Sequence, residues 1–147
     1  MMENADRVRA NTSNEINRRL DRQLEARVRG YEQKSPEEIS DRINELDREW
    51  DTERWLETNA SALAFTGLVL GVTHSKKWLL LPGIVLPFLF QHAVQGWCPP
   101  LPVLRRLGVR TREEIDREKY ALKVLRGDFE KSESSPSSET ALAAVEA

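Results

Sequence analysis

The sequence predicts an all-α membrane protein, in which a two-helix transmembrane hairpin is flanked by cytoplasmic amphipathic helices. Charged residues make up 31% of the 147 residues, yet only three formal charges lie between Leu56 and Trp97. A short polar connection, residues 73–77, divides this apolar stretch into two runs. Two apolar runs joined by so short a connection suit an antiparallel pair of helices that crosses a bilayer twice.

Tryptophans stand where an aromatic belt would place them. Trp55 opens the first run, Trp78 opens the second and Trp97 closes it. A helix from Trp78 to Trp97 rises about 28 Å at 1.5 Å per residue, and the hydrocarbon core of a bilayer is about 30 Å thick. We therefore expect the hairpin to occupy residues 58–97, with the three tryptophans as its interface anchors.

The first run carries a stripe of small residues at helical spacing: Ala60, Ala64, Gly67 and Gly71. In lipid, small residues let neighbouring helices approach closely. A chain reversal centred near Ser75–Lys76 would place Gly67 beside Ile84 and Gly71 beside Leu80. The alternative is that the two glycines face a second copy of the chain and drive its dimerisation.

Four polar residues lie within or beside the predicted spans: Asn59, Gln91, His92 and Gln95. Such residues are candidate functional groups by default, although these lie near the interface, where they can reach water. The same register places Asn59 at the depth of His92, which predicts a hydrogen bond across the hairpin. Haem or metal ligation by His92 would need a partner ligand, and His74 lies at the opposite interface, so we expect no metal and no cofactor.

The rest of the chain divides into charged segments. We expect an N-terminal amphipathic helix in residues 1–34, a second arm helix in 35–57 that leads into the membrane, a C-terminal helix in 98–130 and a disordered tail in 131–147. The apolar stripes of the two arm helices suit packing on each other or binding flat on the membrane surface.

Several boundaries of these helices are marked by local signals. Ser35 to Glu38 reads as a capping box with proline at the first helical position, and Thr111 to Glu114 reads as a second capping box. Three prolines within residues 99–102 end the second membrane helix. No proline or glycine separates Trp50 from the first apolar run, so the second arm helix is expected to run straight into the membrane.

Basic residues near the helix ends predict the orientation. Three arginines lie in residues 38–57 and five in residues 98–117, whereas the turn holds only Lys76 and Lys77. Both termini should therefore lie in the cytoplasm.

The composition excludes several function classes. The net charge of −2 gives no electrostatic footprint for nucleic acid. Cys98 is the one cysteine, so an intrachain disulfide and a zinc site of several cysteines are excluded. Its thiol is the one candidate nucleophile, although a helix C-terminus disfavours a thiolate unless Arg105 and Arg106 fold back to offset it.

Four short segments resemble the YgaP-like transmembrane domain family of bacterial inner-membrane proteins: residues 49–51 (EWD), 56–60 (LETNA), 96–100 (GWCPP) and 107–111 (LGVRT). The resemblance covers about Ser35 to Phe129. It implies a two-helix protein of the bacterial inner membrane whose biochemical role is unknown. Some family members carry a fused rhodanese domain, which this sequence lacks, so no sulfur-transfer activity carries over.

The sequence leaves two hypotheses for the function. The first is a non-enzymatic structural or adaptor subunit in the lipid bilayer, which binds a protein partner or a second copy of itself. The second is a thiol-dependent sulfur or redox carrier that uses Cys98.

Overall fold

The computed structural model describes residues 6–129, which form helices and no strand. Helices account for 78% of these residues, so the predicted all-α class is confirmed. The predicted disordered tail, residues 131–147, lies outside the described residues. The elements in chain order are α1 (Arg7–Ala10), α2 (Asn14–Gly30), α3 (Pro36–Arg48), α4 (Thr52–Thr73), the 3₁₀ helix η1 (Lys76–Leu79), α5 (Leu80–Gln95), α6 (Leu101–Arg106) and α7 (Arg112–Arg126).

The described chain forms two compact units, each made from two separate stretches of sequence. Unit 1 contains residues 6–20 and 50–113, and unit 2 contains residues 21–49 and 114–129. Each unit therefore combines segments that are far apart in the sequence.

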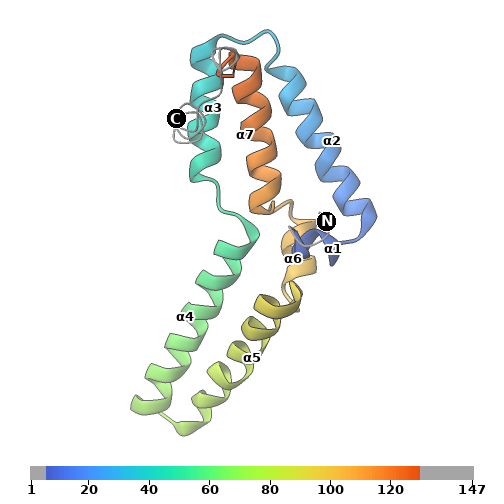
Figure 1. Ribbon diagram of the computed structural model, residues 1–147. Helices are drawn as coiled ribbons and strands as arrows, with labels where there is room; N and C mark the ends of the chain where they lie inside the picture. Colours follow the sequence, from blue (N-terminus) through green and yellow to red (C-terminus); the bar gives the residue numbers. More distant parts are fainter. Residues whose placement is uncertain (1–5, 130–147) are drawn as a thin grey trace, which may run out of the picture. The chain divides into compact units, whose positions relative to one another are not determined.

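Unit 1 is built around α4 and α5, which lie side by side and are joined by η1 (Figure 1). The turn falls within the predicted polar connection. The backbone N–H groups of His74 and Ser75 both donate to the carbonyl of Leu70, at 2.9 and 3.0 Å, and these bonds close the end of α4. Pro82 lies in the first turn of α5, where its missing N–H has little effect.

One stretch among residues 6–129 is long and apolar enough to cross a membrane. It is Lys76–Gln95, which comprises η1 and α5. The 22 residues of α4 are sufficient in length, but its first half carries Glu53, Arg54 and Glu57. These charges make α4 the more polar helix of the pair.

Gly67 and Gly71 are buried on the face of α4 that contacts η1 and α5. A Cβ atom at Gly67 would lie 2.5 Å from Pro82 Cδ, and one at Gly71 would lie 2.5 Å from Leu79 Cδ2. The glycines thus allow the two backbones to approach closely. The residues that face the glycines come earlier in the chain than the predicted Ile84 and Leu80: Gly67 faces Pro82 and Leu81, and Gly71 faces Leu79.

A helix running uninterrupted from the second arm into the membrane segment is also not found. The α3 helix ends at Arg48, Glu49 is extended with ψ of 135°, and α4 begins at Thr52. The Asp51 carboxylate accepts a hydrogen bond from the backbone N–H of Arg54 at 2.8 Å. This N-cap bond starts a new helix without proline or glycine.

The C-terminal segment contains two helices where one was expected. The prediction that the prolines end the second membrane helix is wrong: α5 ends at Gln95, where Gly96 adopts a left-handed conformation, and α6 begins directly after Pro100. Pro102 occupies the first turn of α6, a position whose N–H would have no helical partner in any case. The prolines therefore mark the start of α6, whereas Gly96 ends α5.

The N-terminal segment packs on the end of α5. Arg7 Nη1 donates a hydrogen bond to the carbonyl of Ala93 at 2.6 Å, and Asn11 Nδ2 donates to that of Gln95 at 3.0 Å. The last carbonyls of a helix have no partner within it, so these two side chains cap α5. Gly96 has φ of +73°, and a Cβ atom there would lie 2.4 Å from Arg7 Cβ. Glycine is required at this contact for both reasons.

Unit 2 has a hydrophobic core of its own between α3 and α7. The predicted capping box at the start of α3 is confirmed, because Ser35 and Glu38 exchange both hydrogen bonds. The apolar stripe of α3 packs against α7 of the C-terminal segment, a pairing that neither of the two alternatives for the arm helices predicted. The core consists of Ile39, Ile43, Leu46, Ile115 and Leu122, with Tyr31 packed against it.

A buried carboxylate joins the three helices of unit 2. Glu118 on α7 has no exposed side-chain surface. Its oxygens accept hydrogen bonds from Arg27 Nε of α2 at 3.0 Å and from Arg42 Nη2 of α3 at 3.0 Å. An ion pair of Lys119 with Asp47, at 2.6 Å, adds a second link between α7 and α3.

Candidate functional site

Cys98 is buried in a small apolar cluster of unit 1. It is 3% exposed and packs with Val8, Leu56 and Leu101. Burial raises the pKa of the Cys98 thiol, opposed in part by the backbone N–H of Leu101. The suggested compensation by Arg105 is not found, because its guanidinium bonds instead to Thr12, Asn17 and Val109. The thiol therefore has the setting of a structural cysteine.

The polar residues of the hairpin do not pair as expected. The predicted hydrogen bond between Asn59 and His92 is not formed: Asn59 Nδ2 donates to the carbonyl of Trp55, one turn back on α4, at 2.7 Å. Gln91 and Gln95 bond to each other on the exposed side of α5 at 3.4 Å. His92 alone of the four is buried.

The predicted interface anchors differ in exposure. Trp55 is 40% exposed and Trp78 is 42% exposed, so both present a large part of their rings outward. Trp97 packs against the apolar cluster that contains Cys98. Ala60 and Ala64, the remaining small residues of the stripe, are half-buried.

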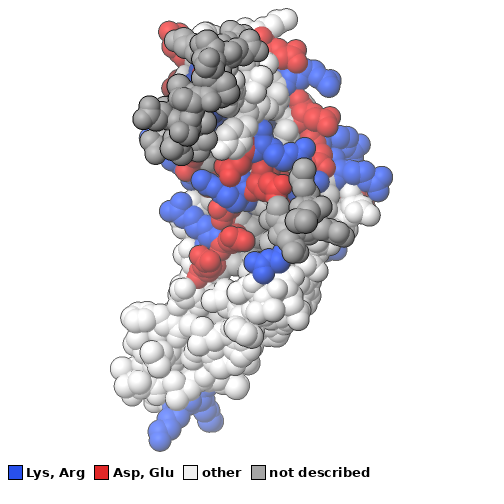
Figure 2. Space-filling model, viewed as in Figure 1, with Lys and Arg blue, Asp and Glu red and all other residues white. Residues whose placement is uncertain are grey.

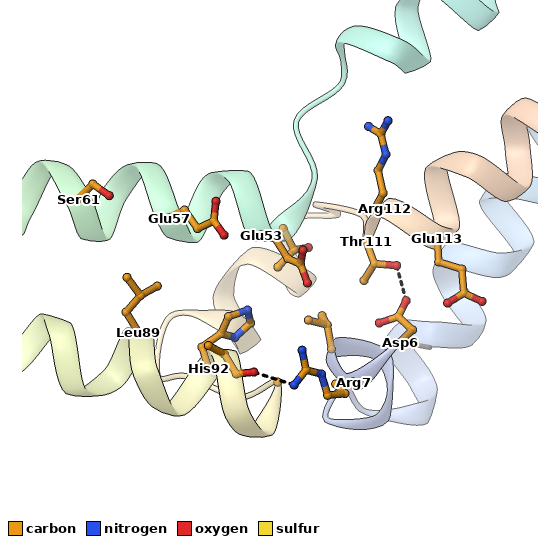
Figure 3. A pocket seen from close by; sticks show the side chains of 14 residues that line it. Asp6, Arg7, Glu53, Glu57, Ser61, Leu89, His92, Thr111, Arg112 and Glu113 are labelled. Atoms are coloured by element: carbon orange, nitrogen blue, oxygen red, sulfur yellow. Dashed lines mark hydrogen bonds between the residues drawn. The ribbon is translucent and has the colours of Figure 1, made fainter. Parts of the chain in front are cut away.

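A polar cavity of about 630 Å³ lies in unit 1, at the end of α4 and α5 that is distant from η1 (Figure 3). Three parts of the chain supply its walls: the segment around α1, the facing turns of α4 and α5, and residues 111–113. Its charged and titratable lining residues are Asp6, Arg7, Glu53, Glu57, His92, Arg112 and Glu113.

Two carboxylates dominate one wall of this cavity. Glu53 and Glu57 lie one turn apart on α4 and face the same space (Figure 3). Within residues 6–129 no side chain forms a hydrogen bond or an ion pair with either carboxylate. By contrast, the Asp6 carboxylate accepts hydrogen bonds from the Thr111 hydroxyl and the backbone N–H of Arg9.

His92 lies between the polar cavity and an apolar groove of about 420 Å³. It is 7% exposed, and its Nδ1 atom has no hydrogen-bond partner among the described residues. Buried polar groups in proteins are nearly always hydrogen-bonded, so an orphaned nitrogen requires an explanation. The groove on the other side is lined by apolar side chains that include Leu63, Phe88 and Leu104.

Sequence reasoning selected His92 but missed the rest of the cavity. One signal was available: Glu53 and Glu57 are like charges four residues apart on a helix, an arrangement that destabilises it. Arg7 and Arg112 could not be found in the same way, because folding alone brings their segments to this end of α4. Among residues 6–129 no group of three metal-ligating side chains is close enough to hold a metal ion.

Comparisons with known proteins add nothing to this description: no family model, no curated protein and no solved structure matches the chain.

Proposed function

We propose that the chain is an integral membrane protein in which α4 and the η1–α5 helix cross the bilayer as a hairpin. One observation carries the proposal: only 6% of the apolar window in Lys76–Gln95 is buried inside the chain. Large side chains of both helices point outward, with Phe65 70%, Val72 80% and Phe90 72% exposed. Figure 2 shows this face free of charge up to the lysines at the turn. A surface of this kind must be covered, and lipid covers it most simply.

The role that fits this architecture is that of a structural or adaptor subunit. The hairpin would anchor the protein in a bacterial inner membrane with both termini in the cytoplasm, where the charged helices bind a protein partner or a second copy. Kinship with the YgaP-like transmembrane domain family is part of the proposal and rests on the four short segments within residues 49–111 that resemble it. The burial of Cys98 favours this role over that of a thiol carrier.

Cysteine labelling tests the membrane hairpin and its orientation together. In a Cys98→Ala background, Ser75→Cys should react with an impermeant maleimide added to intact cells. Glu25→Cys, on α2, should react only after the membrane is permeabilised. Both variants should stay in the membrane pellet after a carbonate wash. Recovery in the supernatant would refute the membrane anchor, and the opposite labelling pattern would refute the orientation.

A second measurement separates the adaptor from the carrier. The Cys98→Ala variant should be purified from membranes in mild detergent beside the parent protein. We expect the same copurifying proteins in the same amounts, because a methyl group replaces the thiol within an apolar cluster. A sulfur or redox carrier would instead lose its partners, or its labelled sulfur, with the thiol.

A further inference from the structure

The apolar groove of unit 1 is walled by α4, α5 and the segment that contains α6. Its α4 wall follows one face of the helix from Leu56 through Ala60 to Leu63. Its α5 wall runs from Val85 to His92, so each wall extends for about 10 Å along its helix. No aspartate, glutamate, lysine or arginine lines the groove, which fits it for an apolar ligand.

Both ends of the groove are bounded by contacts within unit 1. One turn beyond Leu63, a Cβ atom at Gly67 would lie 2.5 Å from Pro82 Cδ, so α4 and α5 touch there. At the other end, Cys98 packs with Leu56. The groove therefore covers about 10 Å of a hydrocarbon core that is about 30 Å thick. If the hairpin crosses the bilayer as proposed, the groove lies in the leaflet next to α6.

The length of the groove distinguishes between its possible occupants. A transmembrane helix of a partner or of a second copy is about 30 Å long and would have to pass over both bounded ends. A phospholipid acyl chain reaches only to the middle of the bilayer, about 15 Å, and can end inside the groove. The rim is accessible to such a chain, since Leu63 is 47% exposed, Phe88 41% and Val103 56%.

The helix α6 places a cation beside the groove. Val103 lines the groove, and Arg106 lies three residues later, where side chains of a helix are neighbours. Arg106 is exposed, and so is Leu107, which continues the apolar surface of Val103 by one turn. Guanidinium groups match the oxygens of phosphate, and an exposed face that mixes apolar residues with arginine suits the headgroup boundary.

The charge of this region selects an anionic headgroup. The chain from Thr58 to Arg112 contains no aspartate or glutamate. The carboxylates that precede it on α4, Glu53 and Glu57, line the polar cavity and not the groove. A zwitterionic headgroup would bring its own cation toward Arg106, whereas an anionic headgroup brings none.

From these observations we propose that the apolar groove binds one acyl chain of an anionic phospholipid, whose phosphate lies against Arg106. The proposal rests on the proposed membrane hairpin and adds a specific lipid site to it. It also gives Ala60 a role, because a methyl side chain between Leu56 and Leu63 leaves room for the acyl chain on the α4 wall.

Photocrosslinking of the full chain in neutral vesicles tests the assignment. Parallel samples contain phosphatidylglycerol or phosphatidylcholine with the same diazirine-bearing acyl chain, and mass spectrometry of peptides locates the label. Phe90 is 72% exposed and does not line the groove, so its label measures contact with bulk lipid. We expect the label at Leu63 and Phe88, relative to that at Phe90, to be about fivefold higher with phosphatidylglycerol. Equal ratios for the two lipids would overturn the proposal.

A first pair of variants locates the acyl chain. Ala60→Leu fills the α4 wall and should lower the label at Leu63 and Phe88 to the level at Phe90. The control, Ala62→Leu, makes the same substitution at an exposed position of α4 outside the groove and should keep the label. Undiminished groove label in Ala60→Leu would refute the assignment.

A second pair locates the phosphate. Arg106→Gln should make the two lipids label the groove equally, because the amide carries no charge. Arg29→Gln removes the same charge at an exposed position of α2 and should keep the fivefold preference. If both variants kept the preference, or both lost it, Arg106 would not be the phosphate contact.

Maleimide labelling of Ser75→Cys is repeated on each variant, so that the lipid site and the hairpin can fail separately. Correct maleimide labelling without lipid label in the groove would refute the lipid site alone and leave the groove to a protein segment. Absent maleimide labelling would refute the membrane hairpin itself.

Discussion

Glu118→Ala is expected to lower the free energy of unfolding of unit 2 by about 3 kcal/mol, the lower end of what removing one partner of a buried ion pair costs. Glu118 is fully buried and accepts hydrogen bonds from Arg27 and Arg42. Without it, the Arg27 guanidinium loses its acceptor, and Arg42 keeps only its ion pair with the exposed Glu45. Arg27 Nη2 is already buried without a hydrogen-bond partner among the described residues, so no other acceptor near Arg27 can replace Glu118.

Hydrogen exchange on peptides from α3 and α7 measures the effect, because the two units need not unfold together. The matched control is Glu45→Ala. Glu45 pairs with the same Arg42, but its side chain is 67% exposed. Exposed pairs contribute about 0–1 kcal/mol. Equal protection loss in the two variants would show that burial of Glu118 is not what stabilises unit 2.

Arg105→Met is expected to release the N-terminal segment from unit 1 and to cost about 2–3 kcal/mol. Arg105 has no exposed surface. It donates to Thr12 Oγ1 at 3.2 Å, to Asn17 Oδ1 at 3.2 Å and to the carbonyl of Val109 at 3.0 Å. The methionine side chain is unbranched like the aliphatic part of arginine, but it cannot donate a hydrogen bond to Thr12 Oγ1, Asn17 Oδ1 or the Val109 carbonyl.

The readout is faster hydrogen exchange and earlier proteolysis in residues 6–20, with the exchange in α4 and α5 unchanged. Arg106→Met is the control, since Arg106 is adjacent in sequence but exposed. Only its backbone carbonyl is used, by Arg19 at 2.8 Å. If Arg106→Met loosened the segment as much as Arg105→Met, net charge rather than the buried guanidinium would be responsible.

Local chemistry predicted much of the secondary structure. The capping box at Ser35 and the position of Pro82 could be read directly, because a cap or a proline acts within a few residues of itself. The break before α4 was missed for the opposite reason. Asp51 is an ordinary N-cap residue, but the sequence around it holds no glycine or proline to draw attention to it.

The candidate site could be predicted only in part. His92 stood out as a histidine inside an apolar run. Its surroundings depend on contacts such as that of Arg7 with Ala93, which are 86 residues apart. Arg105 was interpreted as one of several cytoplasmic basic residues. Hydrophobic periodicity contains no information about which arginine becomes buried, since that is decided by acceptors contributed by distant segments.

Unit 1 is made of two stretches that lie far apart in the sequence, and this determines when it can fold during synthesis of the chain. Residues 6–20 leave the ribosome first, but Ala93, Gln95 and Arg105, to which they bind, are made roughly 90 residues later. Both apolar helices are therefore translated before the N-terminal segment can dock. Unit 1 can therefore close only after α4 and α5 have been synthesised, so the buried Arg105 reaches its acceptors late in the synthesis of the chain.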